Sequence, residues 1–134
     1  MTRRSPSKRS ISPQQLKRRI LRDSASPNEL RDLAFRRVVL AIPAGKVSTY
    51  GKVAAAAGYP LYHRAVARLL RTDPVDLLPW HRVVGAGGEI KLRHEAAQEQ
   101  LLRLKMEGVG FLGKRVDMDA YEHQFRMWEE QEWL

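Results

Sequence analysis

Two short helical patterns, at residues 50–57 and 60–71, constrain the fold of this chain most. Ser48 or Thr49 can cap the first helix, and Gly58 supplies the turn that closes it. Pro60 stands where the second helix would begin, since proline is well tolerated in the first turn of a helix. Two short helices joined by a glycine-containing turn form a helix-turn-helix pattern. We therefore predict a mainly α-helical fold with a helix-turn-helix near its centre.

Flanking elements complete a winged helix-turn-helix. A helix is expected from the capping sequence at Ser26 to Pro43, with a buried apolar face made of Leu30, Leu33, Ala34, Val38, Ala41 and Ile42. Residues 81–84 are expected to form a short strand, residues 85–88 a turn, and residues 89–92 the returning strand of a small β wing. A helix is predicted over residues 96–107, with apolar positions Leu101, Leu102, Leu104 and Met106. Asp119 could cap a final helix that contains Tyr121, Phe125 and Trp128.

The charge of the chain is unevenly distributed. Its 134 residues carry 24 Lys and Arg against 15 Asp and Glu, a net charge of +9. Residues 1–30 hold 8 basic and 2 acidic groups, residues 31–116 hold 15 and 7, and residues 117–134 hold 1 and 6. The basic blocks favour a nucleic-acid partner, and the acidic end should face away from it. We predict a flexible basic arm over residues 1–25, which is too poor in apolar side chains to pack a core, and one domain over residues 26–134.

Cysteine is absent, which excludes disulfides, thiolate nucleophiles and cysteine-based metal sites. The four histidines, at positions 63, 81, 94 and 123, have no metal-ligand spacing, so we expect neither a metal nor another cofactor. No apolar stretch approaches the roughly 20 residues of a membrane span, and none has the length of a signal peptide. These features predict a soluble cytoplasmic protein, nucleoid-associated if bacterial, with no membrane partner.

The segment Pro79-Trp80-His81-Arg82-Val83 resembles the active-site signature Pro-Cys-His-Arg-Val of the O6-alkylguanine-DNA alkyltransferases, with tryptophan in place of the reactive cysteine. Residues 42–54 are similar to the Ile-Pro-x-Gly-x-Val-x-Thr-Tyr-Gly-x-Ile-Ala segment of that family. Arg-Ala-Val at 64–66 resembles its recognition helix, and Leu-Leu at 101–102 with Glu-Gly at 107–108 resembles the segment after its active site. The resemblance covers about residues 35–110 and points to the alkyltransferase-like proteins, which bind alkylated guanine and leave it unrepaired.

The resemblance implies DNA contacts in the helix-turn-helix. Tyr50 corresponds to the tyrosine that crowds the target phosphate and helps to rotate the nucleotide out of the duplex. Arg64 corresponds to the finger that enters the gap left by that nucleotide, where a planar guanidinium can stack and donate hydrogen bonds. Thr49 is expected to bind DNA beside them. Arg68, which departs from the family pattern, suits contact with a phosphate. Without the family-like segment around it, Tyr50 would instead be interpreted as a core tyrosine that holds the helix-turn-helix together.

The resemblance also implies a lesion pocket and a hydrogen-bond network. The expected pocket residues are Trp80, Val83 and Arg93, with the indole as an aromatic wall and the guanidinium at the rim. The alternative to this pocket role is that Arg93 is simply a surface residue of a basic wing. His81 and Glu107 match the pair that activates the cysteine in the enzymes, and Arg82 matches the arginine beside them. With no thiol to activate, we expect these three to form a retained network and no residue to be catalytic.

The sequence departs from the family pattern in two places. Tyr62 and His63 precede the finger where the family has small residues, and Ala67 and Arg68 stand where it has glycines. These bulkier side chains affect how deeply the recognition helix can enter the minor groove. Asp73 replaces a common asparagine, and the loop from it to the tryptophan is one residue shorter than in the enzymes.

The combined hypothesis is a monomeric, noncatalytic DNA-damage recognition protein. It would bind O6-alkylguanine in double-stranded DNA by nucleotide flipping and mark it for nucleotide excision repair proteins, which only the family implies. A family label of methylated-DNA–protein-cysteine methyltransferase would be compatible with this lack of activity. The alternative is a helix-turn-helix transcriptional regulator without lesion specificity. A third hypothesis, hydrolysis of the adduct by His81, Glu107 and water, ranks last because an ether-like bond is a poor target for general-base chemistry.

Overall fold

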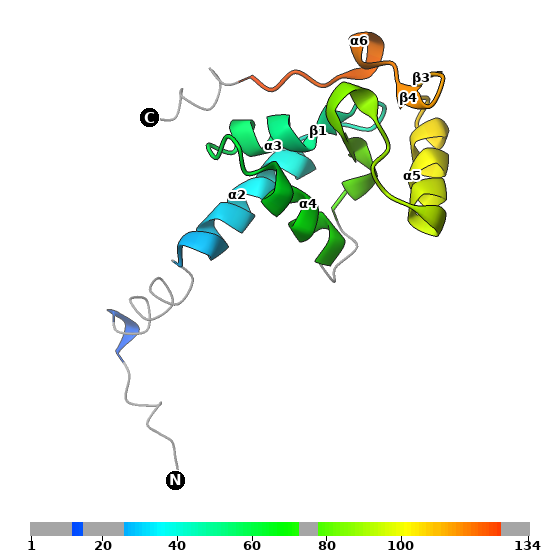
Figure 1. Ribbon diagram of the computed structural model, residues 1–134. Helices are drawn as coiled ribbons and strands as arrows, with labels where there is room; N and C mark the ends of the chain where they lie inside the picture. The colour runs from blue at the N-terminus through cyan, green and yellow to red at the C-terminus, as the bar shows by residue number, and fades with distance from the viewer. Residues whose placement is uncertain (1–11, 15–25, 73–77, 127–134) are drawn as a thin grey trace. The chain divides into compact units, whose positions relative to one another are not determined.

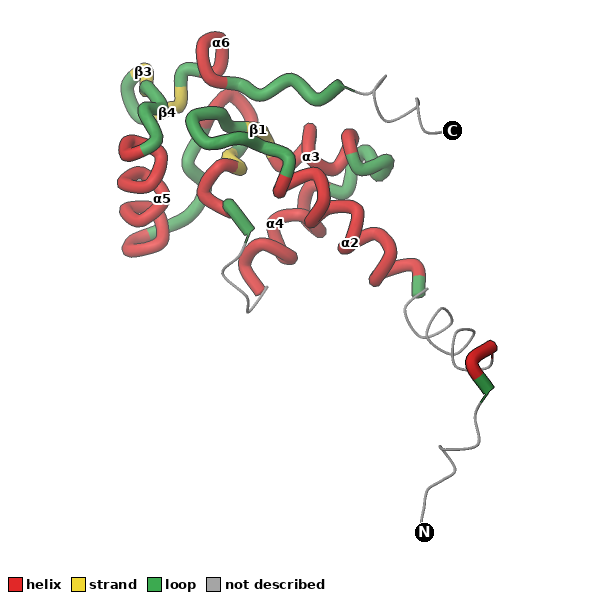
Figure 2. The backbone as a smooth tube through the Cα atoms, turned by 180° about the vertical axis from the view of Figure 1, so that it is seen from behind, coloured by secondary structure: helices red, strands yellow, loops and turns green. Residues whose placement is uncertain are grey.

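The computed structural model describes residues 12–14, 26–72 and 78–126. The chain divides into two compact units, residues 1–31 and residues 32–134, and the second unit contains the helix-turn-helix and the family-like segments at 42–54, 79–83 and 101–108. Helices dominate the described residues, with two small two-stranded sheets (Figure 2). This architecture confirms the predicted fold class. Apart from residues 12–14, the predicted basic arm lies outside the described residues, and its boundary with the domain stays a prediction.

Helix α2, Pro27–Leu40, begins at the predicted cap, where Ser26 Oγ accepts a hydrogen bond from the backbone N–H of Glu29 at 3.1 Å. Its buried side chains are Phe35 and Val39, whereas Leu33 is exposed. The predicted apolar face was therefore wrong at Leu30 and Leu33, which are both exposed, and right at Ile42, which is buried. Phe35 sets the orientation, because its ring packs edge-on against Tyr59 with 5.8 Å between centroids.

The helix-turn-helix consists of α3, Tyr50–Ala56, and α4, His63–Thr72 (Figure 1). Thr49 Oγ1 caps α3 by accepting from the Lys52 N–H at 3.1 Å, as one of the two predicted capping residues. Helix α4 begins three residues later than predicted. Leu61 has a φ of 75°, in the left-handed region, so the chain turns there before the helix can start.

A parallel pairing places the two segments of the candidate site side by side. Strand β1, Ser48–Thr49, pairs with β2, Val83–Val84, in the register Ser48 with Val83 and Thr49 with Val84. The start of α3 therefore lies beside the end of the 3₁₀ helix η2, Trp80–Arg82. Adjacent strand residues face opposite sides, so Val83 enters one core cluster and Val84 the other.

The predicted wing was misplaced. Of the strand predicted over residues 81–84, only Val83–Val84 is a strand, because residues 81 and 82 belong to η2. Ala86–Gly88, predicted as a turn, forms a second 3₁₀ helix, η3, with Gly87 at a φ of 73°. The β hairpin is made by β3, Phe111–Leu112, and β4, Arg115–Val116. Glu89, at the start of the predicted returning strand, forms an isolated antiparallel bridge to Arg115. The backbone of β4 passes so close to Gly88 that a Cβ there would lie 2.5 Å from the Val116 carbonyl oxygen.

Helix α5, His94–Met106, buries Gln100 and Leu104. Two of its predicted apolar contacts were wrong, since Leu102 is 56% exposed and Met106 is 77% exposed. The Gln100 side chain donates to the carbonyl oxygens of His81 at 3.1 Å and Val83 at 2.9 Å. A buried amide that satisfies two backbone acceptors fixes α5 against η2 and β2.

The last described helix, α6, spans Met118–Tyr121. Its cap is Asp117, whose Oδ1 accepts from Ala120 N–H at 3.4 Å, and not the predicted Asp119. The helix ends before Phe125, which packs against the first core cluster. The predicted helical residue Trp128 lies outside the described residues. The Tyr121 carbonyl and the His123 N–H instead hydrogen-bond to the backbone of Val47, which ties this segment to the chain before β1.

Candidate nucleic-acid interface

A hydrogen-bond network centred on Glu107 joins three parts of the chain. Glu107 follows the last residue of α5, and its Oε2 lies 2.8 Å from His81 Nε2. Arg82 donates from Nε to Oε1 at 3.0 Å and from Nη2 to Oε2 at 2.7 Å. The Gly45 N–H donates to Oε1 at 3.1 Å, and Arg82 Nη1 donates to the Ile42 carbonyl at 2.9 Å. The structure thus brings the three predicted network residues together and connects them to the turn before β1.

The network determines the charge of its central carboxylate. Burial raises the pKa of Glu107, but the hydrogen bonds from Arg82, His81 and the Gly45 N–H outweigh that effect and lower the pKa to about 2. The group is therefore an ionised acceptor at neutral pH. With no cysteine in the chain, it has no thiol to activate, and its bonds hold η2, α5 and the residue 42–45 turn together.

Trp80 has a partner that sequence reasoning missed. The guanidinium carbon of Arg103 lies 5.3 Å from the centre of the indole ring, within cation–π range. Arg103 Nε donates to Glu99 Oε2 at 2.7 Å, a pair four residues apart on α5. The Glu–Arg spacing was visible in the sequence, but nothing local indicated that its guanidinium meets a ring 23 positions earlier.

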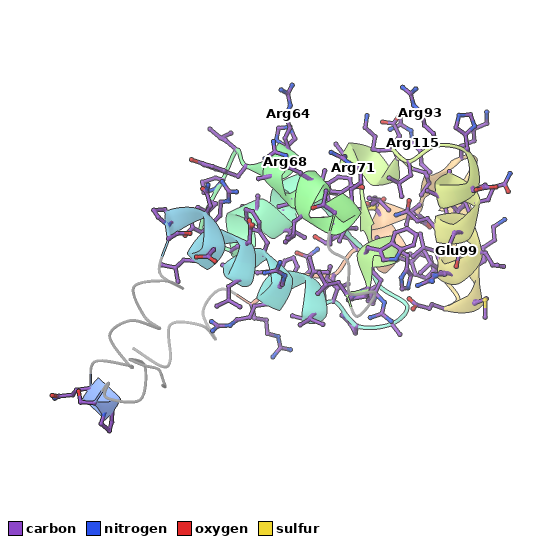
Figure 3. The ribbon with its side chains drawn as sticks, turned by 90° about the horizontal axis from the view of Figure 1, so that it is seen from below. Arg64, Arg68, Arg71, Arg93, Glu99 and Arg115 are labelled. Atoms are coloured by element: carbon purple, nitrogen blue, oxygen red, sulfur yellow. The ribbon has the colours of Figure 1, made fainter. Side chains whose placement is uncertain are left out.

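Three arginines follow one face of α4. Arg64, Arg68 and Arg71 are spaced four and three residues apart, which places them above one another on a helix. All three are exposed, and in Figure 3 Arg64 projects away from the helices while Arg68 and Arg71 follow along α4. Arg64 and Arg68 were predicted, whereas Arg71 was not. We call these residues the α4 arginine row.

Tyr50 and Thr49 sit at the N-terminal end of α3. Tyr50 packs partly buried against the first core cluster, and burial raises the pKa of its hydroxyl, with a smaller opposing effect from the Arg71 charge. The hydroxyl therefore stays protonated and can donate to a phosphate oxygen. Thr49 is buried, and its oxygen already accepts the α3 capping bond. Their DNA contacts stay predictions.

The predicted pocket residues differ in exposure. Trp80 is partly exposed, and Arg93 is an exposed residue at the N-cap of α5 whose side chain points outward in Figure 3. Val83 has no exposed surface and packs with Phe35 and its neighbours in the core. In this conformation Val83 is therefore part of the core and exposes no surface that an adduct could contact. The pocket roles of all three stay predictions.

A separate cavity of about 620 Å³ lies between α5 and the β3–β4 hairpin. It is lined by Ile90, Leu92, Leu101 and Phe111 among others, with Lys105, Lys114 and Arg115 contributing charge. None of the predicted site residues lines it. In the described ranges, no group of three or more His, Asp and Glu residues is placed to hold a metal ion. The same residues contain no helix of the length and apolarity that a bilayer crossing requires.

Comparisons with known proteins agree with the helix-turn-helix fold. Residues 32–109 match the family described as the 6-O-methylguanine DNA methyltransferase, DNA binding domain. A DNA base-flipping protein of Escherichia coli K12 is 41% identical over 91 residues, which cover 66% of this chain and 70% of the relative. Alkyltransferase-like protein 1 of Schizosaccharomyces pombe is 45% identical over 74 residues, 53% of this chain and 68% of that protein. The crystal structure of S. pombe Atl1 in complex with damaged DNA containing O6-carboxymethylguanine superposes with a TM-score of 0.62 at 33% identity, covering 71% of this chain and 95% of that chain.

Proposed function

Because the chain belongs to the 6-O-methylguanine DNA methyltransferase DNA-binding-domain family, as an alkyltransferase-like protein without cysteine, we propose that it recognises O6-alkylguanine in duplex DNA without repairing it. The observation that carries this proposal is the position of Trp80. In the Pro-x-His-Arg-Val motif it stands where the similar enzymes carry the reactive cysteine, and the neighbouring His81 and Arg82 both bond to Glu107. An indole offers no thiolate to accept an alkyl group, but it offers an aromatic surface on which a flipped base can stack.

The arrangement of α3, α4 and η2 supports a flipping mechanism. The parallel pairing of β1 with β2 places Tyr50, which directly follows β1, near the segment that carries Trp80. Tyr50 would meet the target phosphate, while Arg64 would enter the duplex and hydrogen-bond to the orphaned base. Arg68 and Arg71, on the same face of α4, would bind flanking phosphates. Arg93 would stand at the rim of the site, over the alkylated guanine.

The proposal extends to what happens after binding. A protein that holds the lesion without removing the alkyl group leaves the damage in place, so another pathway must excise it. We assign that step to nucleotide excision repair proteins, and we propose that the chain binds DNA as a monomer. The transcriptional-regulator alternative uses the same basic helix, but it requires a preferred base sequence and usually a dimer.

The test of this proposal is equilibrium binding to matched duplexes that differ only in guanine against O6-methylguanine. We expect the lesion duplex to bind at least roughly tenfold more tightly in two unrelated sequences, since stacking of a base on an aromatic side chain is worth about 1–3 kcal/mol. Trp80→Ala should lose most of this preference, and Trp80→Phe should keep part of it. Equal affinity for both duplexes would refute the proposal, and affinity that follows the base sequence would favour the regulator.

A further inference from the structure

The contact between Arg103 and Trp80 places a positive charge at the proposed lesion site. We propose that Arg103 makes the lesion site selective for O6-alkyl groups that end in a negative charge, such as a carboxymethyl group. This inference rests on the proposed function, because it requires the alkyl group to reach Trp80. Its basis is the guanidinium 5.3 Å from the indole centre, which places a permanent positive charge beside the surface proposed to receive the adduct.

The position of this charge is fixed by the fold. The Gln100 bonds to the carbonyl oxygens of His81 and Val83 anchor α5 against the segment that carries Trp80. Arg103 lies nearly one turn beyond Gln100 on the same helix, and Glu99 holds it by its Nε. The arginine side chain is 35% exposed, so its charge is partly removed from water and acts more strongly on a neighbouring group than a fully solvated lysine would.

The charge of Arg103 should give a charged adduct a higher affinity than a neutral adduct of the same shape. A carboxylate that lies against the indole comes within several ångströms of the guanidinium, and such an interaction near a protein surface favours binding by roughly three- to tenfold. A carbamoylmethyl group has nearly the same size and can still accept a hydrogen bond, but it carries no charge and so lacks the charge–charge attraction. The Glu99 carboxylate opposes the effect, because it repels the anionic adduct and partly neutralises Arg103.

Substitutions at the two members of the Arg103–Glu99 pair should have opposite effects. Arg103→Gln should remove the preference for the anionic adduct. Glu99→Gln should increase it by about two- to threefold, because one nearby negative charge is lost. If Arg103 only positioned the Trp80 ring, removing either partner would loosen the ring and weaken every adduct alike. The sign of the Glu99 effect therefore distinguishes charge selection from simple support.

The experiment measures dissociation constants at fixed ionic strength for four duplexes of one sequence, which carry guanine, O6-methylguanine, O6-carboxymethylguanine or O6-(carbamoylmethyl)guanine. The readout is the affinity ratio of carboxymethyl to carbamoylmethyl. We expect this ratio to be roughly three to ten for the unmodified chain, near one for Arg103→Gln and higher for Glu99→Gln. Lys105→Gln is the matched control, since it removes one positive charge from the same helix. Its ammonium lies 5.9 Å from the Phe111 ring, and residues two positions apart on a helix point to different sides.

A ratio near one in the unmodified chain, or an unchanged ratio in Arg103→Gln, would overturn the inference while the preference for O6-methylguanine over guanine could still hold. A ratio that falls equally in Lys105→Gln would also overturn it, because the effect would then reflect total charge. Absence of any preference for O6-methylguanine would instead refute the proposed function itself. The two failures are thus separated within one set of measurements.

Discussion

Replacing Glu107 with glutamine is expected to lower the free energy of unfolding at neutral pH by roughly 2–4 kcal/mol. The side chain is only 17% exposed and accepts hydrogen bonds from Arg82 and the Gly45 N–H while facing His81. The neutral amide keeps the shape but leaves the Arg82 guanidinium without its counter-charge. Chemical denaturation should therefore show a lower midpoint. Glu95→Gln, an exposed change on α5, the helix that Glu107 follows, should alter stability by less than about 1 kcal/mol.

The same network gives stability a defined pH dependence. The pKa of Glu107 falls from its ordinary value of 4.5 to about 2 in the folded chain. Because the folded pKa is the lower one, the contribution is complete above the unfolded value and is lost as the pH falls from about 4.5 through about 2. Glu107→Gln should flatten the stability profile within that window. A variant with the unmodified chain's midpoint and acid sensitivity would show that the network contributes nothing to the fold.

Replacing Arg64 with alanine is expected to weaken binding to an O6-alkylguanine duplex by roughly 1–3 kcal/mol, about 5- to 150-fold. The reason is that the guanidinium would both stack within the duplex and hydrogen-bond to the orphaned base, so its loss affects the flipped complex more than undamaged DNA. Arg64→Lys should rescue little, because an ammonium cannot stack. Titration of matched duplexes with and without O6-methylguanine measures both affinities.

Arg71→Ala is the matched control for the finger, because it removes the same charge from the same exposed face of α4. A residue that contacts only phosphate should weaken all duplexes to a similar extent and leave the lesion preference unchanged. If Arg64→Ala and Arg71→Ala reduce both affinities by equal factors, then Arg64 is another phosphate contact and the finger role is wrong.

Local signals in the sequence predicted the elements that local chemistry determines. The Ser26 cap, the Thr49 cap and the closing Gly58 all depend on residues within one helical turn, and each stands where it was expected. The start of α4 was missed because the left-handed conformation of Leu61 is unusual for a leucine, so no local pattern indicates it. The rotated face of α2 depends on the contact of Phe35 with Tyr59, which only the folded chain brings together.

The remaining differences between the predicted and the observed structure come from contacts between residues far apart in the sequence. The segment after Trp80 was expected to fold back on itself as a wing, but its strand pairs with Ser48–Thr49, 35 positions earlier in the register. The members of the Glu107 network were predicted through resemblance to a family, whereas their bonds to the Ile42 carbonyl and the Gly45 N–H were not. The contact of Arg103 with Trp80 was not predicted either, because the two residues belong to different elements that meet only in the folded chain.

The proposed function requires that this chain hold O6-alkylguanine and leave the alkyl group where it was. A decisive experiment incubates the protein with a stoichiometric O6-methylguanine duplex, verifies complex formation, and then determines the intact masses of both protein and oligonucleotide from the same sample. We expect a stable complex in which neither mass has changed, since tryptophan stands at position 80 and the chain contains no cysteine. A methyl group gained by the protein, or lost from the oligonucleotide, would contradict this proposal.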